Sequence, residues 1–378
     1  MTKKLFILVI FLLVSILNMA SLWNYAFAQS VDTAWVRRYN GTGNGDDVAH
    51  DIAVDDSGNI YVTGISYGNG TFFDYATIKY YLNGDTAWVR RYNGPGDSTD
   101  WATAIAIDDS GNVYITGYSY GSETYDDYAT IKYDSNGNVL WVRRYNGPGD
   151  STDGASGLVV DRAGNIYVTG YSCGSEIDFG YCDYVTIKYY PNGDTAWVRR
   201  YEESGYRYDI AHAIAIDDSG NVYVTGESWS NSVACWDYAT IKYYPNGETA
   251  WVRIYNGPAI YNHATDIALD GSGNVYVTGG SYGSGTYDDY TTIRYDSSGN
   301  ELWVRRYNGS RNDHDVPYAM AVDGSANVYV TGEINGLGID ADYATIKYDS
   351  SGNEVWVRRY NSVNYYDVAY DIALDGME

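Results

Sequence analysis

Residues 74–93 read DYATIKYYLNGDTAWVRRYN, and this stretch decides the fold because the chain repeats it. The opening heptapeptide, DYATIKY, returns five more times with at most two changes. The tripeptide WVR occurs seven times at spacings of 52 to 56 residues, opening at Trp35, Trp88, Trp141, Trp197, Trp251, Trp303 and Trp356. A period of this length predicts tandem units that stack against one another.

Each repeat unit of about 53 residues holds four short runs bounded by turn residues. In one unit these runs are 102–108 (ATAIAID), 112–117 (NVYITG), 128–133 (YATIKY) and 139–145 (VLWVRRY). They are rich in β-branched and aromatic residues, alternate with period two, and are separated by turns in which Gly or Asn supplies a positive φ. We therefore predict an all-β fold, a β-propeller with four-stranded antiparallel blades.

Side-chain size predicts the order of the strands within a blade. Blades crowd at the central axis, so the small AIAID-type run is innermost and the bulky WVRRY run is outermost. On this order the chain begins with an outer strand (33–40), continues through six complete blades and ends with an inner strand (371–375). The design is seven-bladed with an incomplete closing blade, and a ring of six complete blades is the alternative. The two missing strands would come from a partner or from a longer form of the chain.

The repeated unit D-x-x-G-N-[IV]-Y-V-T-G, followed by a Tyr/Lys strand and a Trp strand, resembles the SBBP family of seven-bladed β-propeller repeats. That family is related to the NHL repeat propellers. The resemblance covers 31–378 as a single domain. It implies a bacterial or archaeal protein that is secreted or displayed on the cell surface, and it transfers no catalytic residues.

The N-terminus has the pattern of a secretory signal peptide. Lys3 and Lys4 precede an apolar run over 5–17, and Ala26 and Ala28 supply small residues at the positions that signal peptidase reads. We expect a signal peptide over 1–28 with cleavage after Ala28, a membrane anchor being the alternative, and no membrane span in the mature chain. The protein is then secreted, extracellular or attached to the cell surface.

Three cysteines are too few for a disulfide framework. Two of them, Cys173 and Cys182, lie in one short loop and either bridge locally or stay reduced, and Cys235 is left over.

Net charge and the placement of the histidines argue against two classes of function, nucleic-acid binding and catalysis. The formal net charge of −25 repels phosphate backbones, so nucleic acid is not an expected partner. The four histidines (His50, His212, His263 and His314) show no metal-ligand spacing and do not lie in a nucleophile motif. We therefore do not expect an enzyme.

We expect binding at the connections whose sequence differs from one repeat to the next, because a rigid scaffold presents them. They mix Gly, Ser and Asn with aromatic and acidic residues, a composition that suits sugar stacking or a protein partner. Packing between neighbouring loops is the alternative for any one residue. The candidate ligand-binding residues are Trp101, Tyr120, Tyr171, Trp229, Trp236 and Tyr261.

One acid recurs eight positions before the last residue of each inner run, where the chain approaches the axis. The members are Asp47, Asp100, Asp153, Asp209, Asp315 and Asp367, with Asn262 in the remaining place. Such a ring of oxygen ligands is a candidate calcium site. The alternative is that each carboxylate accepts hydrogen bonds from loop amides or pairs with an Arg. No other cofactor is expected.

Most basic residues sit at positions fixed by the repeat, in the WVRRY and TIKY runs. We predict that they are architectural, paired with repeated carboxylates such as Asp74, Asp127 and Asp342, with their stems over neighbouring aromatic rings. The sequence thus predicts a binding or display module for a glycan or protein. A propeller-fold polysaccharide lyase or glycoside hydrolase is one alternative, and a purely structural surface repeat is another.

Overall fold

The computed structural model describes residues 33–174, 181–202, 208–230, 235–309, 311–335, 341–362 and 366–374. The predicted signal peptide over 1–28 lies outside these residues. Within the described part, no helix is long and apolar enough to cross a membrane.

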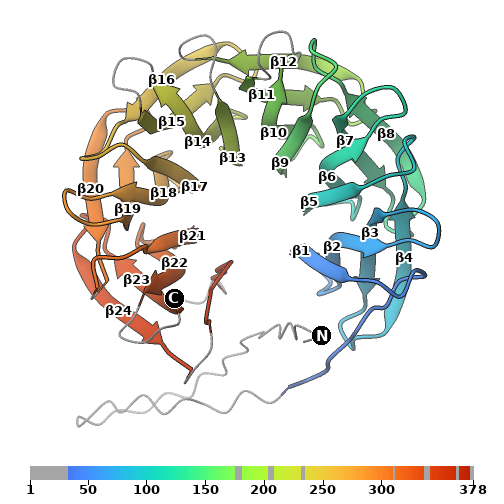
Figure 1. Cartoon of the computed structure of the whole chain (residues 1–378), viewed down its shortest axis with the longest axis horizontal. Coiled ribbons are helices and arrows are strands. Elements are labelled where there is room, and N and C mark those ends of the chain that lie inside the picture. Colours follow the sequence, from blue (N-terminus) through green and yellow to red (C-terminus); the bar gives the residue numbers. More distant parts are fainter. Residues whose placement is uncertain are drawn as a thin grey trace.

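The described chain forms six four-stranded antiparallel sheets arranged as blades around an axis (Figure 1). The inner strands are β1 (Asp47–Val54), β5 (Asp100–Ile107), β9 (Asp153–Val160), β13 (Asp209–Ile216), β17 (Asn262–Leu269) and β21 (Val316–Val322). The second strands are β2 (Ile60–Tyr67), β6 (Val113–Tyr120), β10 (Ile166–Cys173), β14 (Val222–Ser230), β18 (Val275–Tyr282) and β22 (Val328–Asn335).

The third strands are β3 (Phe73–Tyr80), β7 (Asp126–Tyr133), β11 (Cys182–Tyr189), β15 (Cys235–Tyr243), β19 (Asp288–Tyr295) and β23 (Ala341–Tyr348). The outer strands are β4 (Thr86–Tyr92), β8 (Val139–Tyr145), β12 (Thr195–Tyr201), β16 (Thr249–Tyr255), β20 (Glu301–Tyr307) and β24 (Glu354–Tyr360). Each sheet runs from inner to outer in chain order, so the predicted propeller, its four-stranded blades and its strand order are confirmed. We number the blades 1 to 6 in this order.

The inner-to-second hairpin shows why the DDSGN text recurs. Gly58 has φ +75°, the left-handed conformation that glycine adopts without strain. The Asp55 carboxylate accepts hydrogen bonds from the Ser57 and Asn59 amides, at 3.0 and 2.9 Å, and from the Tyr61 hydroxyl at 3.0 Å. One acid thus organises the turn and fixes the buried Tyr of the next strand.

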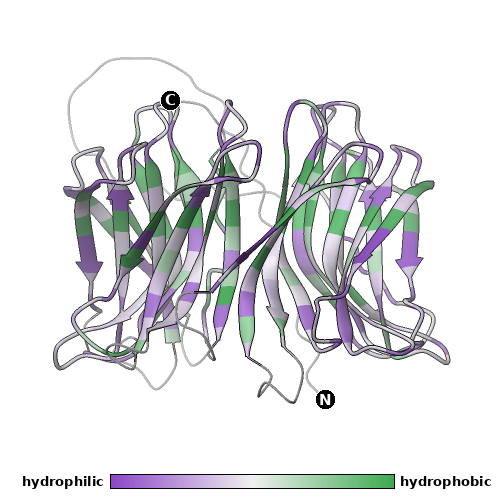
Figure 2. Ribbon diagram, turned by 90° about the horizontal axis from the view of Figure 1, so that it is seen from above, coloured by the Kyte–Doolittle hydropathy of each residue, from purple (hydrophilic) through white to green (hydrophobic). Residues whose placement is uncertain are grey.

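Adjacent blades share hydrophobic cores. Tyr61, Tyr75 and Trp88 of blade 1 pack against Ile105 and Val113 of blade 2, and equivalent clusters recur around the ring. Figure 2 shows the disc side-on, with apolar and polar positions alternating along the strands. The repeated aromatic rings therefore join blades laterally.

The second Arg of WVRRY forms the predicted ion pair. Arg91 contacts Asp74 at 2.7 Å, and Arg144 contacts Asp127 at the same distance. The prediction for Asp342 is not met, because the hydrogen bonds of Arg359 go to the Tyr307 hydroxyl of the preceding blade.

The two outlying segments of the seventh blade do not form strands. Residues 33–40 and 366–374 carry no strand hydrogen bonding, so the strands expected there are wrong within the described residues. Among the described residues, neither segment has a middle strand beside it with which to pair. Both nevertheless lie against their neighbours, since Trp35 Nε1 donates to Leu82 O at 3.1 Å and Asp367 N donates to Ala341 O at 2.8 Å. No strand of the described residues lies between blade 6 and blade 1 (Figure 1).

The structure decides between the two states predicted for Cys173 and Cys182. Cys173 and Cys182, which face each other at the ends of β10 and β11, form a disulfide. Cys235 is buried, with its thiol 3.1 Å from Asp237 Oδ1.

Candidate functional site

The two faces of the disc differ in how strictly they repeat. We call the face with the inner-to-second and third-to-outer hairpins the turn face, and the opposite one the loop face. At the loop-face end of each blade, three strand positions change while their surroundings repeat. The position on the inner strand holds Val48, Trp101, Gly154, Ile210, His263 and Val316 in blades 1 to 6. The position on the second strand holds Ile65, Tyr118, Tyr171, Glu227, Gly280 and Glu333. The position on the third strand holds Phe73, Asp126, Cys182, Trp236, Asp288 and Ala341. Non-repeating residues on a repeating scaffold mark the candidate site.

Three of the four histidines converge at this end of blades 4 to 6. His314, in the connection that leads to β21, places Nδ1 2.9 Å from Asp288 Oδ2. His263 on β17 places its Nδ1 3.9 Å from Asp288 Oδ1. His212 on β13 lies 3.7 Å from Glu227 through Nε2. We call His212, Glu227, His263, Asp288 and His314 the channel-mouth cluster.

The local sequence explains how His263 fits. It pairs across the strands with Gly280, where other blades carry a side chain. A Cβ at Gly280 would lie 2.4 Å from His263 Cε1, so only glycine leaves room for the ring. Burial lowers the pKa of His263, although the charges of Asp288 and Glu227 act in the opposite direction.

Asp288 is nearly fully buried and its two carboxylate oxygens differ. Oδ2 faces His314 and lies within hydrogen-bond distance of its Nδ1. Oδ1 is without a hydrogen-bond partner among the described residues and faces His263. The His314 side chain is 46% exposed. The pair therefore presents a carboxylate-oriented imidazole to solvent, the arrangement that serves proton transfer or hydroxyl binding.

Tyrosines surround this pair. The Tyr287 ring lies 4.7 Å from the His314 ring, and Tyr282 lies 5.9 Å from it. Tyr261 in turn lies 5.2 Å from Tyr282. Tyr287 and Tyr261 are 52% and 46% exposed. Flat apolar rings beside buried acids and imidazoles form a surface with both stacking and hydrogen-bonding groups.

Below the mouth, the central channel contains a hollow of about 440 Å³. Its wall includes His212, Tyr318, Asp51, Asp266 and Asp371. Burial raises the pKa of Asp51 to about 6 and that of Asp266 to about 7, and the negative charge of Asp371 adds to both effects. The channel is thus lined by carboxyl groups, and burial favours the protonated form of Asp51 and Asp266.

The predicted aromatic residues all lie on the loop face, spread over blades 2 to 4 and the connection that leads to blade 5. Trp101 is half-buried and stacked between His50 and Tyr118, with centroids at 4.8 and 6.0 Å. Trp229 and Trp236 meet edge to face at 5.3 Å on blade 4.

Of the remaining three, Tyr120 is exposed and Tyr171 half-buried, and only Tyr261 adjoins the channel-mouth cluster. Both packing and exposure therefore occur within the predicted set, and ligand binding by it stays a prediction.

The acids of the predicted ring each serve their own blade connection. Asp47, Asp100 and Asp153 accept from the amides of Gly41, Gly94 and Gly147 at 3.0, 2.7 and 2.5 Å. Asp209, Asp315 and Asp367 likewise accept amide or hydroxyl hydrogen bonds, from Ser228, Gly309 and Ser362. In the part of the chain with described coordinates, no group of three His, Cys, Asp or Glu is placed to hold a metal. Calcium at these acids stays a prediction.

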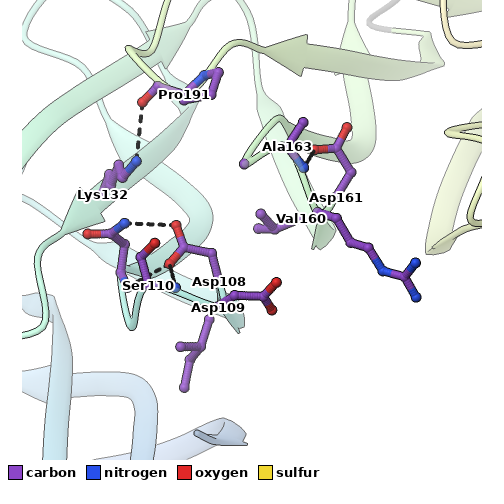
Figure 3. Close-up of a pocket in the computed structure, with 12 residues that line it drawn as sticks. Asp108, Asp109, Ser110, Lys132, Val160, Asp161, Ala163 and Pro191 are labelled. Carbon is purple, nitrogen blue, oxygen red and sulfur yellow. Dashed lines mark hydrogen bonds between the residues drawn. The ribbon is translucent and has the colours of Figure 1, made fainter. Parts of the chain in front are cut away.

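A smaller hollow, of about 280 Å³, lies on the turn face between blades 2 and 3 (Figure 3). Lys132 donates to Pro191 O at 3.2 Å there, and the Asp108 and Asp161 carboxylates hold their own hairpin turns. These groups recur in the other blades with the same contacts. We assign this hollow to the scaffold.

Sequence reasoning did not find the channel-mouth cluster. The signal was present in the spacing, because 51 residues, close to one repeat, separate His212 from His263 and His263 from His314. Residues one repeat apart lie in adjacent blades, so consecutive histidines of this set are expected in neighbouring blades.

Comparison with known proteins agrees with the fold. The family model described as the SBBP beta-propeller repeat matches residues 34–70, 87–123, 140–177, 196–232 and 302–339. Among curated proteins, none matches this chain.

Several solved structures are similar. Sqt1 from Chaetomium thermophilum has 13% identity and a TM-score of 0.53, covering 86% of this chain and 75% of Sqt1. An ulvan lyase of a new polysaccharide lyase family, bound to -[GlcA(1-4)Rha3S]-, has 14% identity and a TM-score of 0.49, covering 81% and 82%. A gluconolactonase from Xanthomonas campestris has 12% identity and a TM-score of 0.37, covering 75% and 92%. At 13% identity, the likeness to Sqt1 shows the fold alone. Because the family model matches five of its repeats and the described residues form six four-stranded blades, this chain belongs to the SBBP beta-propeller repeat family.

Proposed function

We propose that the protein is an exported binding module that holds a glycan on its loop face, over the channel-mouth cluster. The observation that carries the proposal is the group of exposed tyrosines, Tyr261 and Tyr287 with Tyr282 between them, beside the His314–Asp288 pair. Sugar rings stack their C–H faces on aromatic side chains, and imidazole and carboxylate groups bind hydroxyls with fixed geometry.

Charge selects the kind of glycan. The chain carries a formal net charge of −25, and Glu227, Asp288 and Glu333 lie at the channel mouth. An anionic sugar would meet repulsion there. The ligand is therefore a neutral or amino-bearing oligosaccharide, bound in preference to uronates and sulfated sugars.

A glycan array tests this function, followed by calorimetry on the glycans retained. Tyr287→Ala should weaken binding at least tenfold, because it removes a stacking ring. Tyr244→Ala is the matched control, since Tyr244 is 48% exposed but follows β15 on the turn face. Equal loss in both variants, or retention of sulfated glycans only, would contradict the proposal.

The His314–Asp288 pair favours a second candidate, a polysaccharide lyase or glycoside hydrolase. An exposed imidazole oriented by a buried carboxylate is suited to abstract or deliver a proton. New unsaturated or reducing ends released from the bound glycan, and lost in His314→Gln, would support the enzyme. Binding without product would support the module. Silence in both assays, with self-association of the chain, would instead favour a structural surface role.

A further inference from the structure

Acidic side chains gather over one part of the channel mouth. Glu227 on β14, Asp288 on β19 and Glu333 on β22 come from the consecutive blades 4, 5 and 6 (Figure 1). The second-strand position that holds Glu227 and Glu333 carries no acid in blades 1 to 3. Negative charge at the mouth is therefore concentrated over blades 4 to 6.

These acids have no basic partner in the described part of the chain. No Lys or Arg there forms an ion pair with Glu227, Asp288 or Glu333, whose polar contacts are with histidines and a tyrosine. Asp289, the next residue along β19, is by contrast paired with Arg306 at 2.9 Å. The scaffold thus matches its own carboxylates with arginines, whereas the cluster does not.

The imidazole beside two of these acids does not supply the missing positive charge. Burial lowers the pKa of His263 and so favours its neutral form, although the charges of Asp288 and Glu227 act in the opposite direction. Both carboxylates therefore border the same uncharged ring. Half-buried carboxylates without a matching cation favour a positively charged ligand.

Asp288 also directs an unpartnered oxygen into the cluster. Its side chain is only 8% exposed, and Oδ1 accepts no hydrogen bond from any described residue. Oδ1 lies 3.9 Å from His263 Nδ1 and 3.1 Å from the point where a Cβ on Gly280 would stand. It thus faces the place that a second-strand side chain fills in the other blades. Buried carboxylate oxygens ordinarily accept hydrogen bonds, so this one is suited to a donor from outside the chain.

The stacking surface lies one imidazole away from this carboxylate. His314 places Nδ1 2.9 Å from Asp288 Oδ2, and its ring lies 4.7 Å from that of Tyr287. A sugar ring that rests on Tyr287 would carry its substituents past His314 toward the acids. Stacking and charge pairing can therefore act on one sugar residue.

Given the glycan binding proposed above, on which this inference rests, we propose that the channel-mouth cluster selects a protonated amino sugar. Its ammonium group pairs with Asp288 and Glu227 while its ring stacks on Tyr287. An ammonium group supplies positive charge and three donors, and its charge-assisted hydrogen bonds are stronger than those of a hydroxyl. The His263 ring, whose side chain is 29% exposed, turns aside to admit this group to Oδ1. An acetamide or hydroxyl on the same carbon would leave the charge of both acids unmatched.

Three tetrasaccharides with the same β-1,4 backbone test this selection, namely those of glucose, N-acetylglucosamine and glucosamine. They differ only at C2, which carries a hydroxyl, an acetamide or an amine. Calorimetry on the full chain, at a pH at which the amine is protonated, should show at least tenfold tighter binding of the glucosamine tetramer. This preference should shrink as the salt concentration rises, because salt screens charge pairs that border solvent.

Two isosteric variants assign the preference to the cluster. Asp288→Asn and Glu227→Gln should each reduce the glucosamine preference at least threefold and leave the affinity for the glucose tetramer unchanged. Asp126→Asn is the matched control, because Asp126 occupies the same third-strand position in blade 2, and it should keep the full preference. Circular dichroism verifies that all three variants keep the parent fold.

A failure of amine selection and a failure of glycan binding give different results. If a neutral tetramer binds and Tyr287→Ala abolishes that binding, but the glucosamine tetramer binds no more tightly, amine selection is overturned and the binding module stands. Retention of other glycans with none of the three tetramers bound has the same meaning. A preference that survives both Asp288→Asn and Glu227→Gln, or that Asp126→Asn removes as well, would also overturn the assignment. Absence of binding by every glycan on the array would overturn both proposals.

Discussion

Removal of a tyrosine hydroxyl should destabilise the fold at one of two equivalent positions and leave its stability unchanged at the other. Tyr128 is fully buried and donates to Val185 O at 3.2 Å across the interface between blades 2 and 3. That carbonyl also accepts from Thr169 Oγ1 at 3.3 Å, so Tyr128→Phe does not leave it without a donor. The loss is then one ordinary hydrogen bond, about 1 kcal/mol. In a chain of this size it corresponds to a fall in Tm of roughly 2 °C.

Tyr343→Phe is the matched substitution in blade 6. Its hydroxyl has no acceptor among the described residues, while its ring keeps the stacked contact with Tyr360 at 5.2 Å. We expect no measurable change in unfolding free energy. Guanidinium titration followed by circular dichroism, together with calorimetric Tm, measures both variants against the parent. Equal losses at the two positions would refute the interface account, because they would require a neighbour for Tyr343.

Three further predictions rest on single groups. Burial raises the pKa of Asp153 to about 6, above its ordinary value of 3.8, so its contribution to stability is fully present below pH 3.8 and is lost as pH rises through about 6. Asp153→Asn, which places at this position the residue found at Asn262 in blade 5, should stabilise the fold by about 1–2 kcal/mol at pH 8 and by nothing at pH 4. The reason is that a shift of about two pKa units is worth more free energy than one lost hydrogen bond. A gain that is the same at both pH values would contradict this. Asp108 should act in the opposite sense, because hydrogen bonds from Asn112 and Tyr114 lower its pKa despite burial, so Asp108→Asn should be most harmful above pH 4; harm confined to lower pH would contradict it. Reduction of the Cys173–Cys182 disulfide should cost about 2–3 kcal/mol by the chain-entropy relation, and an unchanged Tm with dithiothreitol would show that the bond is absent.

The scaffold could be predicted from the sequence because its physics is local and repeated. The Asp-x-x-Gly-Asn turns, the alternating strands and the small inner runs each indicate one structure, and six copies agree. The ion pairs of Arg91 and Arg144 followed from the same repetition. The two outlying strands at 33–40 and 371–375 could not be judged in this way, because a strand forms only where a neighbour pairs with it.

The candidate site lies in what does not repeat, and there residue types alone were insufficient. Trp101 and Trp236 were notable as aromatic residues in variable connections, yet both are partly packed against other rings. Asp288 was not singled out, because its role depends on His314 from the next blade. That contact becomes visible only when positions one repeat apart are compared as neighbours.

The central claim, that the repeats build the scaffold and the non-repeating loop face binds the ligand, is tested most directly by one pair of affinities. Calorimetry would measure the binding of a retained neutral oligosaccharide to Tyr287→Ala and Tyr244→Ala, two exposed tyrosines on opposite faces. The account predicts a loss of at least tenfold for Tyr287→Ala and unchanged affinity for Tyr244→Ala. Unchanged affinity for Tyr287→Ala together with a loss for Tyr244→Ala would place the ligand on the turn face and contradict the claim.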